Sequence, residues 1–157
     1  MTASAQTLFD TAPLGALVAF SDGEPRPPER FARKLRAWRD RNATGRLIRR
    51  TPARAGRPAA FTLLLGGLRA EDLLVLIVQR SFEVACALTF EVVDGPKTGE
   101  ILCLTPYGDE LELRHVAADL NDAAAWLDRN RYCRALFHEV RPGGATRAIL
   151  LPDGLVA

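Results

Sequence analysis

The sequence lacks any apolar segment long enough to cross a lipid bilayer. Its longest uninterrupted apolar run is Leu73–Val78, whereas a membrane-spanning helix needs about 20 such residues. Basic residues are also missing before Arg26, and Asp10 interrupts the apolar residues near the start. A secretory signal peptide is therefore not expected. Together these absences predict a cytoplasmic protein that makes no membrane contact.

Cysteine and histidine are too few and too widely spaced to form a local metal site. Cys86, Cys103, Cys133, His115 and His138 include no pair at C-x-x-C or H-x3-H spacing, which structural zinc sites usually contain. Each cysteine lies in an apolar, strand-like context, which favours buried, reduced thiols. We therefore expect no metal and no cofactor.

Signatures of common enzyme classes are also missing. Gly66-Gly67 has neither Walker nor dinucleotide-binding spacing, and it is typical of a turn. The sequence contains no G-x-S-x-G and no H-E-x-x-H motif. These absences favour a protein that acts by binding rather than by catalysis.

Two isolated groupings remain as alternatives for catalysis. His115 is a possible general base assisted by Glu112 or Asp119, and Cys133 with His138 is a conceivable nucleophilic pair. In a regular strand, however, Glu112 points to the face opposite His115. Nothing in the sequence distinguishes either grouping from structural residues.

Length and composition describe one ordinary globular domain. The chain has 157 residues, of which 48% are hydrophobic and 25% are charged, as in a typical folded protein with a core of its own. We expect a single domain over 1–157. Residues 143–157 are expected to form an edge strand or a loose tail.

Hydrophobic periodicity predicts many short strands. Alternation with period 2 is clearest from Phe82 to Val92, with a break near 85–87, and Leu73–Gln79 has the composition of a buried strand. Further strands are expected at 14–20, 46–51, 60–65, 100–104, 110–115 and 134–140. In the strand at 110–115, Glu110 and Glu112 are expected to form a solvated acidic face.

Two helices are expected between these strands, at about 28–42 and about 120–130. Phe31, Leu35 and Trp38 form one apolar face of the first helix. Asp119 or Asn121 caps the second. The whole pattern predicts an α+β fold with a mainly antiparallel, curved sheet or small barrel of about six to eight strands.

Charge is the most unusual property of the chain. Between Glu24 and Pro58 there are twelve Arg or Lys residues and three acids, a local net charge of +9, although the whole chain carries only +2. The residues after Pro58 carry nine basic and fourteen acidic side chains. A strongly basic segment therefore precedes an acidic one, which points to a polyanionic or acidic partner.

Nucleic acid is the leading candidate for that partner. Clustered arginines bind backbone phosphates without requiring a tight motif. Because Phe31 and Trp38 are expected to face the core, no platform for base stacking is predicted, and little base readout is expected. The candidate contacts come from the first helix and the hairpin after it: Arg30, Lys34, Arg41, Arg46, Arg49, Arg50, Arg54 and Arg57.

A second hypothesis uses the same side chains. Arginine pairs with carboxylates in two-point geometry, so that the basic surface would suit a protein–protein adaptor or inhibitor that docks on an acidic protein surface. A second copy of this chain, with its acidic C-terminal part, would be such a surface and would give a homodimer. The plainest alternative is an ordinary solvated helix face in an arginine-rich protein.

Overall fold

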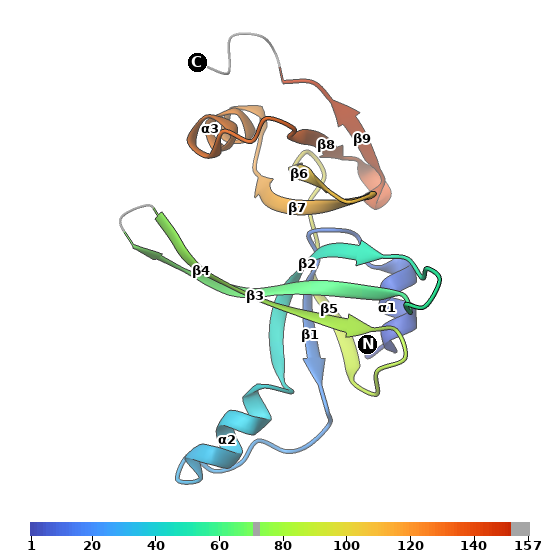
Figure 1. The fold of residues 1–157 in the computed structure, drawn as a ribbon, viewed down its shortest axis with the longest axis vertical. Coiled ribbons are helices and arrows are strands. Elements are labelled where there is room, and N and C mark those ends of the chain that lie inside the picture. Colours follow the sequence, from blue (N-terminus) through green and yellow to red (C-terminus); the bar gives the residue numbers. More distant parts are fainter. Residues whose placement is uncertain (71–72, 152–157) are drawn as a thin grey trace. The chain divides into compact units, whose positions relative to one another are not determined.

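The computed structural model describes residues 1–70 and 73–151 (Figure 1). The chain divides into two compact units, each described below by itself. Unit 1 contains Met1–Ala12 and Ala16–Asp94, whereas Pro13–Gly15 and the residues from Gly95 onward form unit 2. The expectation of one domain stays a prediction.

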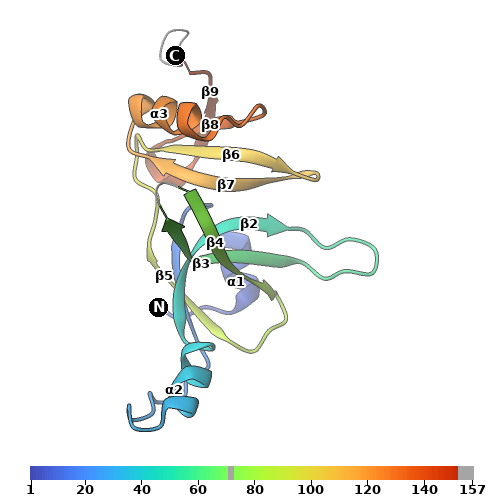
Figure 2. The same ribbon diagram turned by 60° about the vertical axis from the view of Figure 1, so that its left-hand side comes forward.

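Unit 1 is a five-stranded antiparallel sheet with two helices. The strand order is β4-β3-β2-β1-β5 (Figures 1 and 2). Its elements, in chain order, are α1 (Ala5–Thr11), β1 (Leu17–Ser21), α2 (Ala32–Arg39), β2 (Ala43–Thr51), β3 (Ala60–Ala70), β4 (Leu73–Glu83) and β5 (Thr89–Asp94).

Four phenylalanines form the core of unit 1. Phe20, Phe61, Phe82 and Phe90 are all buried and come from four different strands. Although β4 and β5 are the two edges of the sheet, the ring centroids of Phe82 and Phe90 lie 5.3 Å apart. The sheet is therefore strongly curved without closing. Phe82 and Phe90 belong to the alternating run in the sequence, and the predicted break separates β4 from β5.

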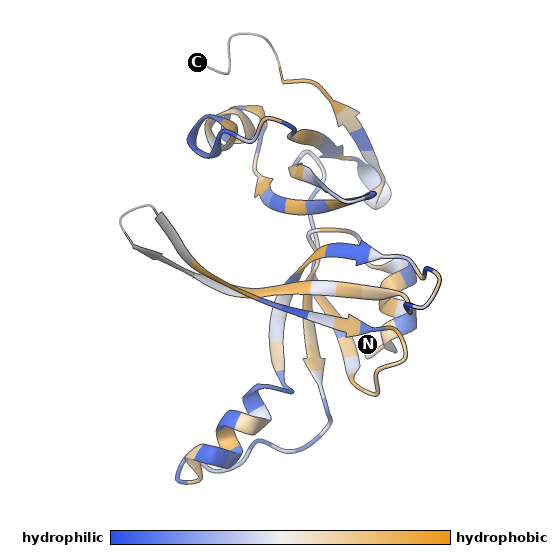
Figure 3. Ribbon diagram, in the orientation of Figure 1, coloured by the Kyte–Doolittle hydropathy of each residue, from blue (hydrophilic) through white to orange (hydrophobic). Residues whose placement is uncertain are grey.

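The predicted burial of Leu73–Gln79 is wrong for the residues whose side chains are described. Leu76, Ile77 and Val78 are 53%, 43% and 43% exposed, and they form an apolar part of β4 (Figure 3). The reason is topological. The pairing of β3 with β2 ends at Leu64, and beyond that point β4 is the only strand of the described residues that pairs with β3.

The helices of unit 1 differ from expectation in number and length. The predicted helix at 28–42 begins at Ala32 and ends at Arg39. The chain forms a turn before it, in which the Phe31 N–H donates to Pro28 O at 3.0 Å. α1, whose cap is Ser4, was not predicted. Its Leu8 is buried, but at 7 residues the helix is too short for a clear periodic signal.

Unit 2 is a four-stranded antiparallel sheet, ordered β7-β6-β8-β9, with one helix packed on it. Its elements are β6 (Ile101–Tyr107), β7 (Glu110–Ala117), α3 (Leu120–Asn130), β8 (Leu136–Val140), the 3-10 turn η1 (Pro142–Gly144) and β9 (Thr146–Ile149). Asp119 caps α3 as predicted, because its side chain accepts the Asp122 N–H at 2.9 Å. Trp126 packs inward against Phe137, Ile101 and Cys103.

The architecture confirms a mixed α+β fold with antiparallel sheets. The described residues form nine strands and three helices, more than the six to eight strands and two helices expected. Neither sheet closes, so a small barrel is unconfirmed. Within the segment expected as an edge strand or a loose tail, residues 146–149 form β9, at one edge of the sheet of unit 2. Residues 152–157 lie outside the described part. Within the described residues, no helix has the length and apolar character required to span a membrane.

Candidate functional site

The first group of candidate residues lies around α2. Arg30, Lys34 and Arg41 are exposed, and among the described residues only Arg41 of these three pairs with an acidic side chain, that of Asp22 at 3.7 Å. Five cations in and next to the helix are exposed, and among the described residues none of them lies within ion-pair distance of a carboxylate. We call them the α2 cations: Arg30, Arg33, Lys34, Arg36 and Arg39.

Phe31 lies among these cations, and its predicted place in the core is wrong. Its side chain is 42% exposed, with the guanidinium carbon of Arg30 4.8 Å and the ammonium nitrogen of Lys34 5.5 Å from the ring centroid. Phe31 is the N-cap residue, with φ −100° and ψ 66°. Because it stands outside the helical repeat, it does not share the face of buried Leu35.

Hydrogen bonds fix the C-terminal end of α2. Trp38 Nε1 donates to Glu24 O at 2.7 Å, which ties the proline-containing segment before α2 to the helix. Asn42 Nδ2 donates to both Trp38 O and Asp22 Oδ1. The bond from Asn42 is the main cause that lowers the pKa of Asp22 below its usual value. Arg80 of β4 donates to Asp40 O at the end of the helix.

The second group of candidate residues lies on β2 and on the loop after it. Arg46, Arg49 and Arg50 are half-buried on β2. Arg49 Nη2 donates to Thr62 Oγ1 at 3.3 Å, and Arg50 Nη1 donates to Phe9 O at 3.1 Å. These contacts give both guanidinium groups a role in holding unit 1 together.

Arg54 and Arg57 face each other across the turn that joins β2 to β3. Both side chains are exposed, and their backbones form a two-way bridge with N···O distances of 3.0 and 2.9 Å. Gly56, between them, has φ +77°, a conformation that favours glycine. The turn therefore presents these two arginines next to each other.

The structure does not bring the α2 cations and the Arg54–Arg57 turn together. α2 precedes β2 and the Arg54–Arg57 turn follows it, so that they lie at opposite ends of the strand (Figures 1 and 2). Measured along the strand, the nine residues of β2 separate them by roughly 30 Å, at about 3.3 Å each. Arg46, Arg49 and Arg50 lie on β2 between α2 and the turn.

A bulge in β7 changes the predicted arrangement around His115. Cys103 pairs with His115 and Leu104 with Leu113, so that Arg114 is an extra residue in β7. The alternation of side chains changes at this point. Glu112 is therefore not part of a solvated acidic face: it is 3% exposed and pairs with Arg114 at 2.8 Å.

The carboxylate next to His115 is Asp122, which the sequence analysis did not consider. His115 Nε2 lies 3.4 Å from Asp122 Oδ2, and its ring stacks on Trp126. The pKa of Asp122 is below its usual value, chiefly because the Ala118 N–H donates to it and further because of His115. The spacing of Asp122 from Asp119 could have predicted this position. An acidic side chain three residues after the cap of a helix often accepts a hydrogen bond from the backbone that precedes the helix.

The thiols differ from one another in exposure, and the expectation that all three are buried is wrong. Cys103 is buried, Cys86 is half-buried and Cys133 is exposed; all are free. Burial raises the pKa of Cys103 to about 12, so that it is a neutral thiol at physiological pH. In the described residues no hydrogen bond joins Cys133 to His138, and no group of three potential metal ligands is present.

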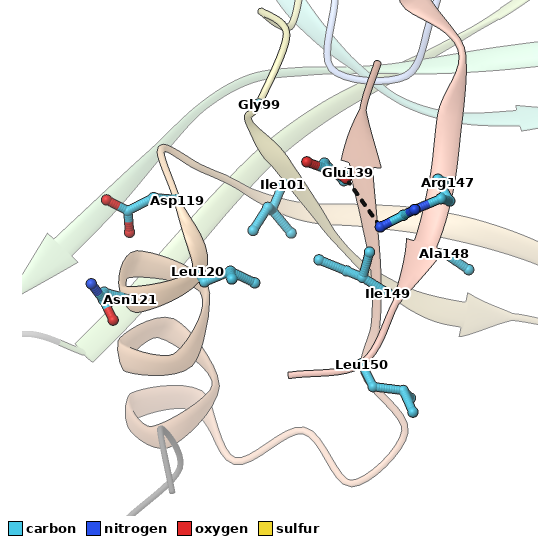
Figure 4. Close-up of a pocket in the computed structure, with 10 residues that line it drawn as sticks. All are labelled: Gly99, Ile101, Asp119, Leu120, Asn121, Glu139, Arg147, Ala148, Ile149 and Leu150. Atoms are coloured by element: carbon cyan, nitrogen blue, oxygen red, sulfur yellow. Dashed lines mark ion pairs between the residues drawn. The ribbon is translucent and has the colours of Figure 1, made fainter. Parts of the chain in front are cut away.

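Unit 2 also contains an open cavity of about 800 Å³ beside β9 (Figure 4). Glu139 pairs with Arg147 at 3.7 Å on its wall and with Arg141 at 3.1 Å. The lining residues come from the start of α3 and from three strands or their flanks: Gly99, Ile101, Asp119, Leu120, Asn121, Glu139, Arg147, Ala148, Ile149 and Leu150. Sequence periodicity gave no sign of this cavity, because it forms only when α3 and β9 meet on the sheet.

Comparison with known proteins places the chain in a family. No curated protein and no solved structure matches it. A family model described as "Uncharacterised conserved protein UCP036055" matches residues 3–143, which include most of both units. The chain therefore belongs to the uncharacterised conserved protein family UCP036055.

Proposed function

We propose that this protein is a non-catalytic binding protein that contacts the phosphate backbone of nucleic acid through residues 26–58. The observation that carries the proposal is the set of α2 cations, which are exposed and lack a carboxylate partner among the described residues. An exposed guanidinium or ammonium group without a carboxylate partner can replace the counterions around a phosphate. The release of these counterions favours binding.

The Arg54–Arg57 turn would provide a second contact. Both side chains are exposed on a narrow turn that projects from the sheet, a shape that suits a nucleic-acid groove or backbone. Since roughly 30 Å of β2 separates this turn from α2, the two contacts would lie on different stretches of the nucleic acid. The half-buried Arg46, Arg49 and Arg50 would support the turn and contribute positive potential.

The salt dependence of binding tests the proposal. Two double variants, R30A/K34A and R54A/R57A, remove two charges each from the two contact regions. For single strands, each pair should reduce the slope of log K against log salt concentration by about 1.4 if both charges contact phosphates. The measurement is fluorescence anisotropy of a labelled oligonucleotide across a salt series.

A charge-matched control separates contact from net charge. R129A/R147A removes two arginines from unit 2 and lowers the net charge of the chain equally. The proposal expects the control to keep the wild-type slope. Equal slopes for all three double variants, or no salt-dependent binding by the wild-type protein, would contradict it.

A second candidate function is docking on a protein with an acidic surface, including another copy of this chain. One observation favours a protein partner: Leu76, Ile77 and Val78 are exposed on the edge strand β4, and exposed apolar strand edges pair readily with other chains. Co-purification with and without nuclease separates the two functions. A partner that nuclease removes supports nucleic acid, whereas a dimer or an acidic protein that survives nuclease supports docking.

A further inference from the structure

The exposed ring of Phe31 is unusual in a segment so rich in charge. An aromatic side chain that is 42% exposed exposes apolar surface to water, and the charged groups of Arg30 and Lys34 lie over its ring. The two cations lie next to the ring because its face carries negative potential. The result is an aromatic surface with a positive charge on two neighbouring side chains.

The backbone holds this ring in a defined position. The Phe31 N–H donates to Pro28 O at 3.0 Å, and Phe31 O accepts the Leu35 N–H at 2.9 Å. Both bonds fix the main chain at the start of α2, while the side chain stays at the surface. A ring with two rotatable bonds on a fixed backbone loses little conformational entropy when a ligand covers it.

We propose that Phe31 is a stacking platform for an unpaired base of single-stranded nucleic acid, with Arg30 and Lys34 contacting the phosphates on either side of that base. This inference rests on the proposed nucleic-acid binding and names its substrate class. Stacking of bases on aromatic rings, combined with cations that follow the backbone, is the general mode of sequence-tolerant single-strand binding.

The chemistry selects single strands over duplexes. In a duplex, neighbouring bases cover both faces of each base. The Phe31 ring can therefore stack on a base of a duplex only if that base leaves the stack. An unpaired base offers its face directly. The Arg54–Arg57 turn, by contrast, has only charges at its tip and does not distinguish the two forms by this mechanism.

Three substitutions of Phe31 separate stacking from packing. F31A removes the ring, F31L keeps an apolar side chain without an aromatic face, and F31W keeps the face. F31A and F31L should each weaken binding of a single-stranded oligo-dT or oligo-U by about fivefold or more, with an unchanged salt slope because no charge is lost. F31W should bind like the wild type. Binding to a dA·dT duplex should change less than about twofold.

The control is Y107A, which removes an aromatic side chain of similar exposure, 52%, from unit 2 and should leave binding unchanged. Circular dichroism and thermal unfolding check that each variant is folded. Oligo-dT and oligo-U distinguish DNA from RNA as the source of the base, and weaker binding of either by F31A and F31L supports the inference.

Two outcomes would overturn the inference and leave the proposed function intact. In the first, F31A binds single strands as tightly as the wild type, although R30A/K34A flattens the salt dependence. In the second, F31A weakens single-strand and duplex binding equally, which would mean that the ring only positions the two cations. If the wild-type protein shows no salt-dependent binding of any nucleic acid, the proposed function itself fails.

Discussion

Replacing Arg114 with alanine should destabilise unit 2 by about 2–4 kcal/mol. Arg114 Nη1 lies 2.8 Å from Glu112 Oε1, and its Nε donates to Thr105 Oγ1 at 2.8 Å. Its guanidinium carbon lies 5.6 Å from the ring centroid of Tyr132. The substitution removes all three contacts and leaves the carboxylate of Glu112, only 3% exposed, without its arginine.

The expected magnitude follows from the burial of the pair. Loss of one partner from a fully buried ion pair costs about 3–5 kcal/mol, because a charge remains in a poorly solvated position. The Arg114 side chain is 28% exposed, and Glu112 has at least one further contact. Both facts reduce the cost to about 2–4 kcal/mol, which is a large part of the 5–15 kcal/mol typical of a domain.

Urea unfolding provides the assay. Trp126 lies in the core of unit 2, and a W38F background makes its fluorescence specific for that unit. With a urea dependence of about 2 kcal/mol per M, the unfolding midpoint should fall by about 1–2 M. R147A is the matched control. That side chain is 64% exposed, and Arg141 still pairs with Glu139 when it is removed, so a loss under about 0.5 kcal/mol is expected.

A double variant tests the cause. E112Q/R114A removes the buried charge together with its partner and should be more stable than R114A alone, because an amide is easier to bury than a carboxylate. If R114A unfolds within about 0.5 kcal/mol of the wild type, or if the double variant regains nothing, the ion pair does not support unit 2 as argued.

Two further predictions concern titration in unit 2. The pKa of Asp122 is lowered from 3.8, first by the Ala118 N–H and further by His115. The ionised carboxylate of Asp122 therefore stabilises the folded state above pH 3.8. This stabilisation is lost as the pH falls through the lowered pKa. The melting temperature of the wild type should therefore exceed that of D122N near neutral pH, and the gap should close in acid; a gap that is constant with pH would contradict this. For the thiols, burial and the raised pKa of about 12 should protect Cys103 from alkylation in the native protein, while exposed Cys133 reacts. Mass spectrometry after brief maleimide treatment checks this, and equal labelling of both thiols would refute it.

Elements whose signal is local can be predicted from the order of the residues alone. The alternation from Phe82 to Val92 supplies two of the four rings in the core of unit 1, because every second side chain of a strand points to the same face. α3 begins after its predicted cap, Asp119, and turns Trp126 inward, because capping and helical spacing depend on neighbouring residues only. The antiparallel α+β class follows from many strands at short spacing.

Which faces and ends come together depends on the three-dimensional path of the chain. The bulge at Arg114 changes the face of β7 to which Glu112 points, so that Glu112 lies in the interior. The alternation of apolar and polar residues in the sequence does not show where a strand contains an extra residue. Phe31 lies outside the helical repeat because a turn, and not a helix, follows Pro28. In both cases a local departure from regular strand or helix geometry reverses the burial of a large side chain.

The basic segment shows the same limit for function. Its charge is a property of composition and is visible in the sequence, whereas the distance between its charges depends on the path of the chain. Nine extended residues of β2 place Arg30 and Lys34 at one end of the sheet and Arg54 and Arg57 at the other. Each residue of a strand adds about 3.3 Å to its length. Basic residues that are close in the sequence therefore lie on separate surfaces of the fold.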